Sequence, residues 1–267
     1  MIPPLTYFEF HALFLAPPIL ALVAVSWRRS RLDRRLLEAT AILSIAAVAY
    51  TTPWDAWLIE AGVWWYGEGV VAGRILGVPL GEYAFFLLQP VLTLAWTAQF
   101  QLSAVGSPSM SPWDRLVGAL AGIFVGAVGW TLLGGSSPLE GSAWLDGSAA
   151  YLGAVLLWAG PVLAVQWAYD WRALVRRRRT LALGVCVPTL YLCLADRIAI
   201  GLGLWRISSD HTTGITPLGL PIEEGAFFLA TNVFLVQGLL AYVRLVESGT
   251  GTAAGNGTAT TERGGDR

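Results

Sequence analysis

The chain has 267 residues, of which 55% are hydrophobic and only 13% are charged, and its formal net charge is -1 at pH 7. Soluble domains average about 45–50% apolar and about 25% charged residues, so this composition excludes an ordinary soluble protein and indicates a membrane protein embedded in a lipid bilayer. The absence of a strong positive charge also argues against nucleic acid as a partner.

Seven stretches are apolar enough to span a bilayer, which takes about 20 residues as a helix. In chain order they are Tyr7–Trp27, Leu36–Thr52, Val78–Phe100, Leu116–Leu133, Tyr151–Trp171, Thr180–Ile200 and Leu220–Val246. The second stretch leads into Asp55 and the sixth contains Asp196 and Arg197, which weakens their hydropathy signal. Both are therefore predicted as spans partly from their spacing along the chain. No basic segment precedes the first stretch, so we expect it to stay as a helix rather than act as a signal peptide. The predicted fold class is an all-α polytopic membrane protein with seven transmembrane helices.

Arginine residues predict the orientation of these helices. They cluster at 28–35 and at 172–179, and short cytoplasmic connections carry an excess of positive charge. We therefore expect a cell-membrane protein with its N-terminus outside and its C-terminus in the cytoplasm. The segment 248–267, rich in Gly, Thr and Ala, is predicted to be a disordered cytoplasmic tail.

The chain contains an internal repeat. The equivalent residues are Tyr7 and Tyr151, Pro17 and Pro161, Asp55 and Asp196, Trp64 and Trp205, Glu82 and Glu224. We expect one integral-membrane domain, residues 1–247, made of repeat one (5–100), a linker helix (114–134) and repeat two (150–246). Because the linker contributes a single helix, the repeats run parallel, so equivalent residues reach the same side of the membrane.

Each repeat carries an acidic motif at the start of its last helix. Positions i, i+3, i+4 and i+7 share one helix face, which in each repeat holds one acid, two Phe rings and one polar group. The two faces are Glu82, Phe85, Phe86, Gln89 and Glu224, Phe227, Phe228, Thr231. Asp55 and Asp196 end the preceding helices on the same side. We expect these four acids to converge, with Glu223 as a fifth, because ionisable residues within membrane spans are rare and usually functional.

Simpler explanations exist for each of these residues. Acids near a helix N-terminus gain about 0.3–1 kcal/mol from the helix dipole, Asp196 could form an ion pair with Arg197, and the Phe rings could serve packing alone. His11 lacks the companion ligands of a metal site and is either a hydrogen-bonded core residue or a proton partner. Motifs for nucleotide, phosphate or hydrolase chemistry are absent, so we expect neither a metal nor a cofactor.

The motif residues resemble the membrane-integral lycopene cyclases of archaea, actinobacteria and fungi. That family carries a Pro-x-Glu-Glu-x-x-x-Phe-like motif followed by Gln-Pro or Thr-Asn. The matching residues here are Pro221, Glu223, Glu224, Phe227, Phe228, Thr231 and Asn232, and in the first repeat Pro79, Glu82, Phe85, Phe86, Gln89 and Pro90. The resemblance covers about residues 5–245. Gly81 departs from it, because the family usually has the first Glu of the earlier motif there.

The resemblance implies a redox-neutral cyclisation of lycopene, a C40 carotenoid, through γ-carotene to β-carotene. The acids expected to carry the chemistry are Glu224, Glu223, Glu82, Asp196 and Asp55. The residues expected to contact the substrate or stabilise its cation are Phe85, Phe86, Phe227, Phe228, Trp64, Trp205, His11, Gln89 and Asn232. Lycopene and other carotenoids would be its substrates.

Other functions fit the same residues. A seven-helix transporter uses acids at mid-membrane as proton or substrate sites, and a receptor for a hydrophobic ligand would need a similar apolar cavity. Within the enzyme class, a cyclase for C50 carotenoids or a carotenoid hydratase also remains open.

Overall fold

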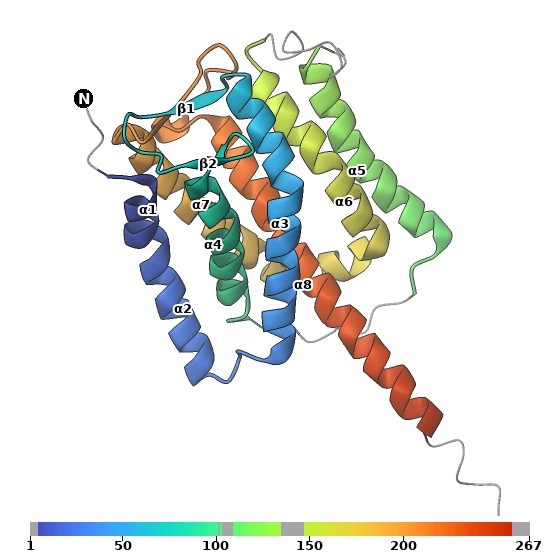
Figure 1. Ribbon diagram of the computed structural model, residues 1–267. Coiled ribbons are helices and arrows are strands. Elements are labelled where there is room, and N and C mark those ends of the chain that lie inside the picture. Colours follow the sequence, from blue (N-terminus) through green and yellow to red (C-terminus); the bar gives the residue numbers. More distant parts are fainter. Residues whose placement is uncertain (1–4, 101, 103–108, 135–146, 258–267) are drawn as a thin grey trace, which may run out of the picture.

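The computed structural model describes residues 5–100, 102, 109–134 and 147–257, and helices dominate it (Figure 1). The first long helix is formed by α1 (Tyr7–Phe10), the π-helical turn η1 (His11–Leu15) and α2 (Ala16–Arg28). The others are α3 (Arg34–Glu60), α4 (Leu80–Thr97), α5 (Pro112–Leu132), α6 (Ala150–Arg176), α7 (Arg178–Gly201) and α8 (Ile222–Gly257). The short elements are β1 (Trp64–Tyr66), β2 (Arg74–Ile75), β3 (Val78–Pro79), β4 (Trp205–Ile207) and the 3-10 turn η3 (Pro217–Gly219).

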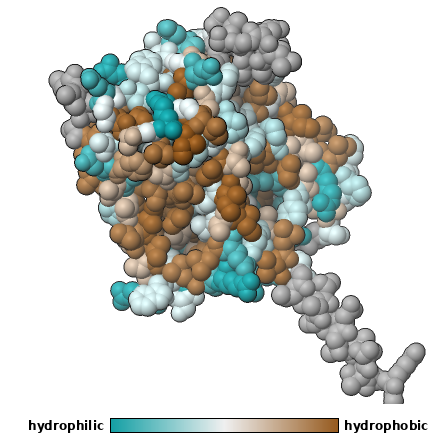
Figure 2. Space-filling view, viewed as in Figure 1, coloured by the Kyte–Doolittle hydropathy of each residue, from teal (hydrophilic) through white to brown (hydrophobic). Residues whose placement is uncertain are grey.

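The predicted all-α polytopic membrane fold is confirmed. Within the described residues, six helices are long and apolar enough to cross a membrane. Helix α4 is the one predicted span outside this set, because Glu82 and Gln89 lower its hydropathy. These polar residues are tolerated because α4 lies inside the bundle, with nine of its 18 residues buried. Hydrophobic residues dominate the middle of the face shown in Figure 2, and hydrophilic residues are more frequent toward its two ends.

Helix α3 is longer than its apolar stretch predicts. We expected it to end near Thr52, but it continues to Glu60 and includes both Pro53 and Asp55. A backbone surrounded by apolar groups must satisfy its hydrogen bonds internally, so helix continues past the polar residues that end the hydropathy signal. Asp55 therefore lies inside the helix, five residues before its end.

Helix α8 also differs from the prediction at its C-terminal end. The expected tail begins at Ser248, whereas the helix continues to Gly257 and projects away from the bundle (Figure 1). Extending an existing helix requires no new nucleation, so a helix packed as far as Val243 continues into a polar segment. The rest of the predicted tail, 258–267, lies outside the described residues.

The two repeats are joined by an antiparallel pair of strands whose register is symmetric. In β1 and β4, Trp65 pairs with Arg206, and the flanking pairs are Trp64 with Ile207 and Tyr66 with Trp205. Exchanging each residue for its repeat equivalent reproduces the same pairs. The flanking hydrogen bonds follow this rule, with Gly67 N to Leu204 O at 2.9 Å and Ser208 N to Val63 O at 2.8 Å. This strand pair thus has a local two-fold axis that exchanges residues of one repeat with their equivalents in the other.

The loops before α4 and α8 repeat an unusual backbone conformation. Leu76 and Leu218 have φ angles of 50° and 54°, and the glycine after each, Gly77 and Gly219, has a φ of 82°. A bulky residue in the left-handed region is a strained exception. Because it occurs at both equivalent positions, the two loops have the same backbone conformation at this point.

Helix α5 packs against α6 through a row of glycines. Gly118, Gly122, Gly126 and Gly129 face the α6 backbone. A Cβ atom at Gly122 would lie 2.1 Å from the backbone nitrogen of Ala164, whereas one at Gly126 would lie 3.5 Å from the Cα of Gly160. Small residues of this kind let transmembrane helices approach closely.

This packing predicts a difference between two alanine substitutions on α5. Gly122→Ala should lower the free energy of unfolding by about 1–3 kcal/mol, as overpacking does, because backbone atoms cannot move aside. Gly126→Ala adds the same methyl group where ordinary contact distance is available and should change stability by less than about 1 kcal/mol. Thermal unfolding in detergent compares the two, and equal stability of both variants would contradict the packing described.

Candidate active site

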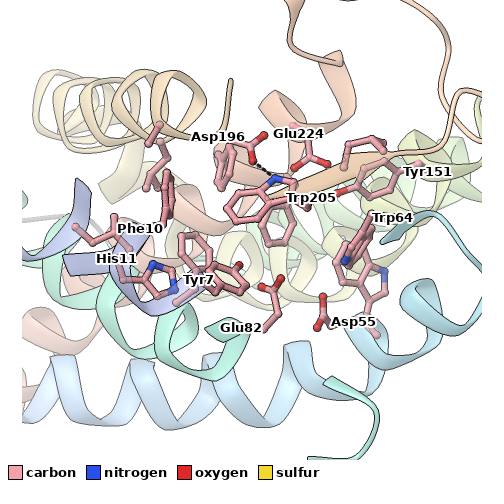
Figure 3. A pocket seen from close by; sticks show the side chains of 18 residues that line it. Tyr7, Phe10, His11, Asp55, Trp64, Glu82, Tyr151, Asp196, Trp205 and Glu224 are labelled. Carbon is pink, nitrogen blue, oxygen red and sulfur yellow. Dashed lines mark hydrogen bonds between the residues drawn. The ribbon is translucent and has the colours of Figure 1, made fainter. Parts of the chain in front are cut away.

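A pocket lies where the two repeats meet, and Trp64 of β1 and Trp205 of β4 form part of its wall (Figure 3). Side chains from both repeats line it, and most of them are aromatic or acidic. They are Tyr7, Phe10, His11, Leu15, Trp54, Asp55, Trp64, Glu82, Phe85, Tyr151, Leu192, Ala195, Asp196, Trp205, Ile207, Glu224, Phe227 and Phe228.

Four of the five predicted acids line this pocket. Glu82 and Glu224 belong to the first turns of α4 and α8, while Asp55 and Asp196 each lie five residues before the end of α3 and α7. Figure 3 shows Asp196 and Glu224 on one side of the pocket and Asp55 and Glu82 on the other. Each repeat therefore contributes one Asp–Glu pair, and the two pairs face each other.

Hydrogen bonds from aromatic side chains orient these acids. Trp205 donates through Nε1 to Asp196 Oδ1 at 2.7 Å, and the Tyr66 hydroxyl donates to Glu82 Oε1 at 2.6 Å. Trp64 Nε1 in turn donates to the Tyr66 hydroxyl at 2.9 Å. The second oxygens of Asp55 and Asp196 are buried without a hydrogen-bond partner. These two oxygens are thus available to a bound molecule.

Tyrosine residues are the part of the site that the motif search missed. Tyr7 interacts through its hydroxyl with Glu82, and Tyr151 does so with Glu224. The repeat alignment already paired these two residues, which was the signal that could have identified them. Tyr66 has no such signal, because its repeat equivalent is Ile207 and its role depends on the fold of the loop. Burial and the neighbouring carboxyl of Glu82 raise the pKa of Tyr66 well above its usual range, so its hydroxyl remains a donor.

Gly81 and His11 form a feature of the first repeat alone. His11 donates from Nε2 to the Gly81 carbonyl at 2.9 Å, which leaves its buried Nδ1 without a partner. A Cβ atom at Gly81 would lie 2.1 Å from the ring of Tyr7. The departure from the Glu-Glu pattern therefore has a steric reason, because only glycine leaves room for this tyrosine.

Glu223 does not join the other acids. It is fully buried, but it lies outside the pocket and accepts a hydrogen bond from the Thr213 backbone N–H at 2.7 Å. Consecutive residues on a helix point in directions about 100° apart, so the wall that Glu224 lines cannot also receive Glu223. The structure thus brings together four acids rather than the expected five.

Gln89 and Asn232 also lie outside this pocket, in a polar network where α4 crosses α8. Gln89 Nε2 donates to Thr231 Oγ1 at 2.7 Å, and Thr93 Oγ1 donates to Asn232 Oδ1 at 2.7 Å. Asn232 Nδ2 completes the network by donating to Thr189 Oγ1 at 3.0 Å. This network links α4, the last helix of repeat one, with α8, the last helix of repeat two.

The aromatic candidates divide between the pocket and its surroundings. Phe85, Phe227, Phe228, Trp64 and Trp205 line the pocket, whereas Phe86 lines a neighbouring cavity.

The alternative ion pair of Asp196 with Arg197 is not formed, because the Arg197 side chain turns outward and donates to the Leu218 carbonyl at 3.1 Å. In the described part of the chain, no group of three or more His, Cys, Asp or Glu side chains could hold a metal ion.

Comparison with known proteins identifies similar sequences along both repeats. The sequence model described as lycopene cyclase matches residues 5–100 and 148–241. A lycopene beta-cyclase of Halobacterium salinarum is 47% identical over 237 residues, which cover 89% of this chain and 95% of that protein. A bifunctional lycopene cyclase/phytoene synthase of Gibberella fujikuroi is 32% identical over 88% of this chain but only 40% of its own length. No solved structure matches this chain.

The steric role of Gly81 predicts the outcome of adding one methyl group there. Gly81→Ala should displace the Tyr7 ring and lower the free energy of unfolding by about 1–3 kcal/mol. Gly225→Ala is the matched control, because it also adjoins a pocket glutamate but its Cβ would lie 3.9 Å from the nearest atom, Cys193 Sγ. Thermal unfolding of both variants in detergent checks this, and a stable Gly81→Ala protein would show that Tyr7 is not confined.

Proposed function

This chain belongs to the lycopene cyclase family, and on that premise we propose that it is a lycopene beta-cyclase, which closes the acyclic ψ-ends of lycopene into β-ionone rings. The observation that carries this proposal is the pocket itself, in which two Asp–Glu pairs face each other among aromatic rings. Acids supply and remove protons, and rings stabilise the carbocation formed between these steps. Family membership does not favour the transporter, receptor, C50-cyclase or hydratase alternatives.

The reaction begins with a proton. We assign its donation to Glu224, which interacts with Asp196 and Tyr151. Several carboxyl groups in one apolar cavity cannot all be ionised without a large desolvation cost, so the cavity holds protons for delivery. Protonation of the terminal double bond of lycopene places a positive charge on the adjacent carbon, and attack by a nearby double bond closes the six-membered ring.

Aromatic side chains stabilise the cation before it loses its proton. Phe85, Phe227 and Phe228 line the pocket together with Trp64 and Trp205, and each ring face in a dry site contributes up to about 2 kcal/mol by cation–π attraction. Exclusion of water is equally important, because water would trap the cation as an alcohol. The rings therefore serve both purposes.

A base on the other side of the pocket completes the cyclisation. We assign this role to the facing pair, Glu82 and Asp55, with the Glu82 carboxylate held by the Tyr66 hydroxyl. One proton is added and one is removed, so the product is an isomer of the substrate. No electrons are transferred, and the proposal calls for no cofactor.

The membrane setting follows from the same arrangement. The arginine-rich connections at 28–35 and 172–179 lie at the end of the bundle opposite to β1 and β4 (Figure 1). By the positive-inside rule, we propose that the strand end, with the pocket, faces the outer side of the cell membrane. The C-terminus then lies in the cytoplasm, and carotenoid reaches the pocket from the lipid bilayer.

The acid assignment predicts different effects for two neighbouring glutamates. Glu224→Gln should abolish formation of β-carotene in a bacterial host that accumulates lycopene, because the amide cannot donate a proton of comparable acidity. Glu223→Gln should keep most of the activity, because Glu223 lies outside the pocket and the amide oxygen can still accept the hydrogen bond from Thr213. Chromatography of the pigments measures both outcomes. The amount of each variant protein in the membrane fraction is the control for folding. Full β-carotene output from Glu224→Gln would refute its role as donor.

A test with purified components separates the enzyme from the other classes. The protein in detergent or vesicles, supplied with lycopene but with neither ATP nor an added cofactor, should produce γ-carotene and then β-carotene. A transporter or receptor would leave the pigment unchanged. Absence of ring formation by folded protein would therefore contradict the proposed function.

A further inference from the structure

We propose that the polyene chain of the substrate lies in a lateral groove between α3 and α6 that continues from the acid pocket and opens toward the lipid. This inference rests on the proposed function, since it concerns the part of the same substrate that the pocket does not enclose. The reacting end group occupies the pocket, but the rest of a C40 molecule must extend beyond it. The groove can hold this remainder because it shares a wall residue, Phe227, with the acid pocket.

The groove is a cavity of about 500 Å³ with apolar walls. Helix α3 forms one wall, α6 forms the other, and α4 and α8 form the floor. The lining residues are Leu43, Ala46, Ala47, Tyr50, Thr51, Phe86, Gln89, Pro90, Trp158, Pro161, Val162, Val165, Gln166, Phe227, Thr231, Phe234 and Leu235. A lining that is mostly apolar suits a hydrocarbon.

Several polar groups along the groove have partners within the protein, whereas Gln166 Oε1 and Trp158 Nε1 are buried without one. The Tyr50 hydroxyl donates to the Trp158 carbonyl at 2.7 Å, and Gln166 Nε2 donates to the Phe234 carbonyl at 2.9 Å. Gln89 belongs to the α4–α8 network. The hydrogen-bonded groups of Tyr50, Gln166 Nε2 and Gln89 therefore need no partner from an occupant, which agrees with a ligand that is largely apolar.

The outer side of the groove is open along the faces of α3 and α6. Val165 is 72% exposed and Tyr50 is 38% exposed, and Ala46 and Pro161 are also exposed. Both helices are among those long and apolar enough to span a membrane, so these residues face acyl chains. A carotenoid dissolved in the bilayer can thus enter sideways, without crossing water.

Three aromatic rings connect the groove with the acid pocket. Phe227 lines both cavities, and its ring stacks on Trp54 with centroids 5.6 Å apart and planes 6° from parallel. Trp54, from the pocket, also stacks on Trp158, from the groove, at 4.9 Å. A flat polyene and flat rings pack closely, so this stack forms a continuous surface from the entrance to the acids.

The equivalent interface in the other half of the molecule is packed with side chains. There the Tyr191 hydroxyl donates to the Phe14 carbonyl at 2.5 Å, as Tyr50 does to Trp158. The space between α2 and α7 holds a hydrophobic cluster that includes Ile19 and Leu192, with Leu22 and Val23 packed against it. The local two-fold symmetry is therefore broken in favour of the α3–α6 groove.

The proposal is tested by filling the groove without touching the acids. Ala47→Phe places a ring inside it, while Ala49→Phe adds the same ring to an exposed position of α3 outside the groove. Both are made in the Glu224→Gln background, so that lycopene binds without reacting. Affinity is measured by quenching of tryptophan fluorescence on titration with lycopene in vesicles.

We expect Ala47→Phe to weaken lycopene binding by at least about tenfold, or about 1.4 kcal/mol, and Ala49→Phe to leave it unchanged. Unchanged binding by both variants would overturn the groove assignment, and so would equal weakening by both. When the same two substitutions are made in the wild-type protein, the proposal predicts that Ala49→Phe still forms β-carotene and that Ala47→Phe does not. Tight binding without any ring formation by the wild-type protein would instead overturn the proposed function and leave the groove in place.

Discussion

Burial of four carboxyl groups in a membrane protein is the constraint on which the rest of this structure depends. An unpaired charge in contact with acyl chains is costly, so the acids must face inward and be enclosed. Neither repeat encloses its own Asp–Glu pair, because the pocket forms only where the halves meet. Strands β1 and β4 cover it, and the crossing of α4 and α8 fixes the distance between the two pairs. The reactive centre and the interface between the repeats are therefore one region.

Sequence patterns predicted most of the large features. Apolar length indicated the helices, and matching offsets indicated the repeat and its acids, because these depend on local periodicity. Features that depend on loop geometry, on the direction of a single side chain or on where a helix ends escaped prediction. Tyr66 reaches Glu82 only because β1 folds over the pocket. Glu223 points away from the pocket because its neighbour in the helix, Glu224, points into it. The end of α3 was also missed, since hydropathy falls at Pro53 while the helix continues.

The differences between the repeats are as informative as their similarity. His11 and Gly81 accompany Tyr7 in the first repeat, whereas Val155 and Glu223 accompany Tyr151 in the second. An open groove occurs on one side of the bundle and a packed cluster on the other. A duplicated framework thus holds two acid pairs in equivalent positions while presenting different surroundings to a substrate.

The pairing of β1 with β4 has a consequence for how the protein is made. Its two strands are separated by four helices in the chain, α4 to α7, and the register requires both strands. During synthesis, residues 64–66 and the first acid pair are inserted well before their partners exist. Contacts between distant parts of a chain form slowly, and the second acid pair is complete only when Glu224, at the start of the last helix, has been synthesised. Completion of the site is thus among the final steps of biogenesis.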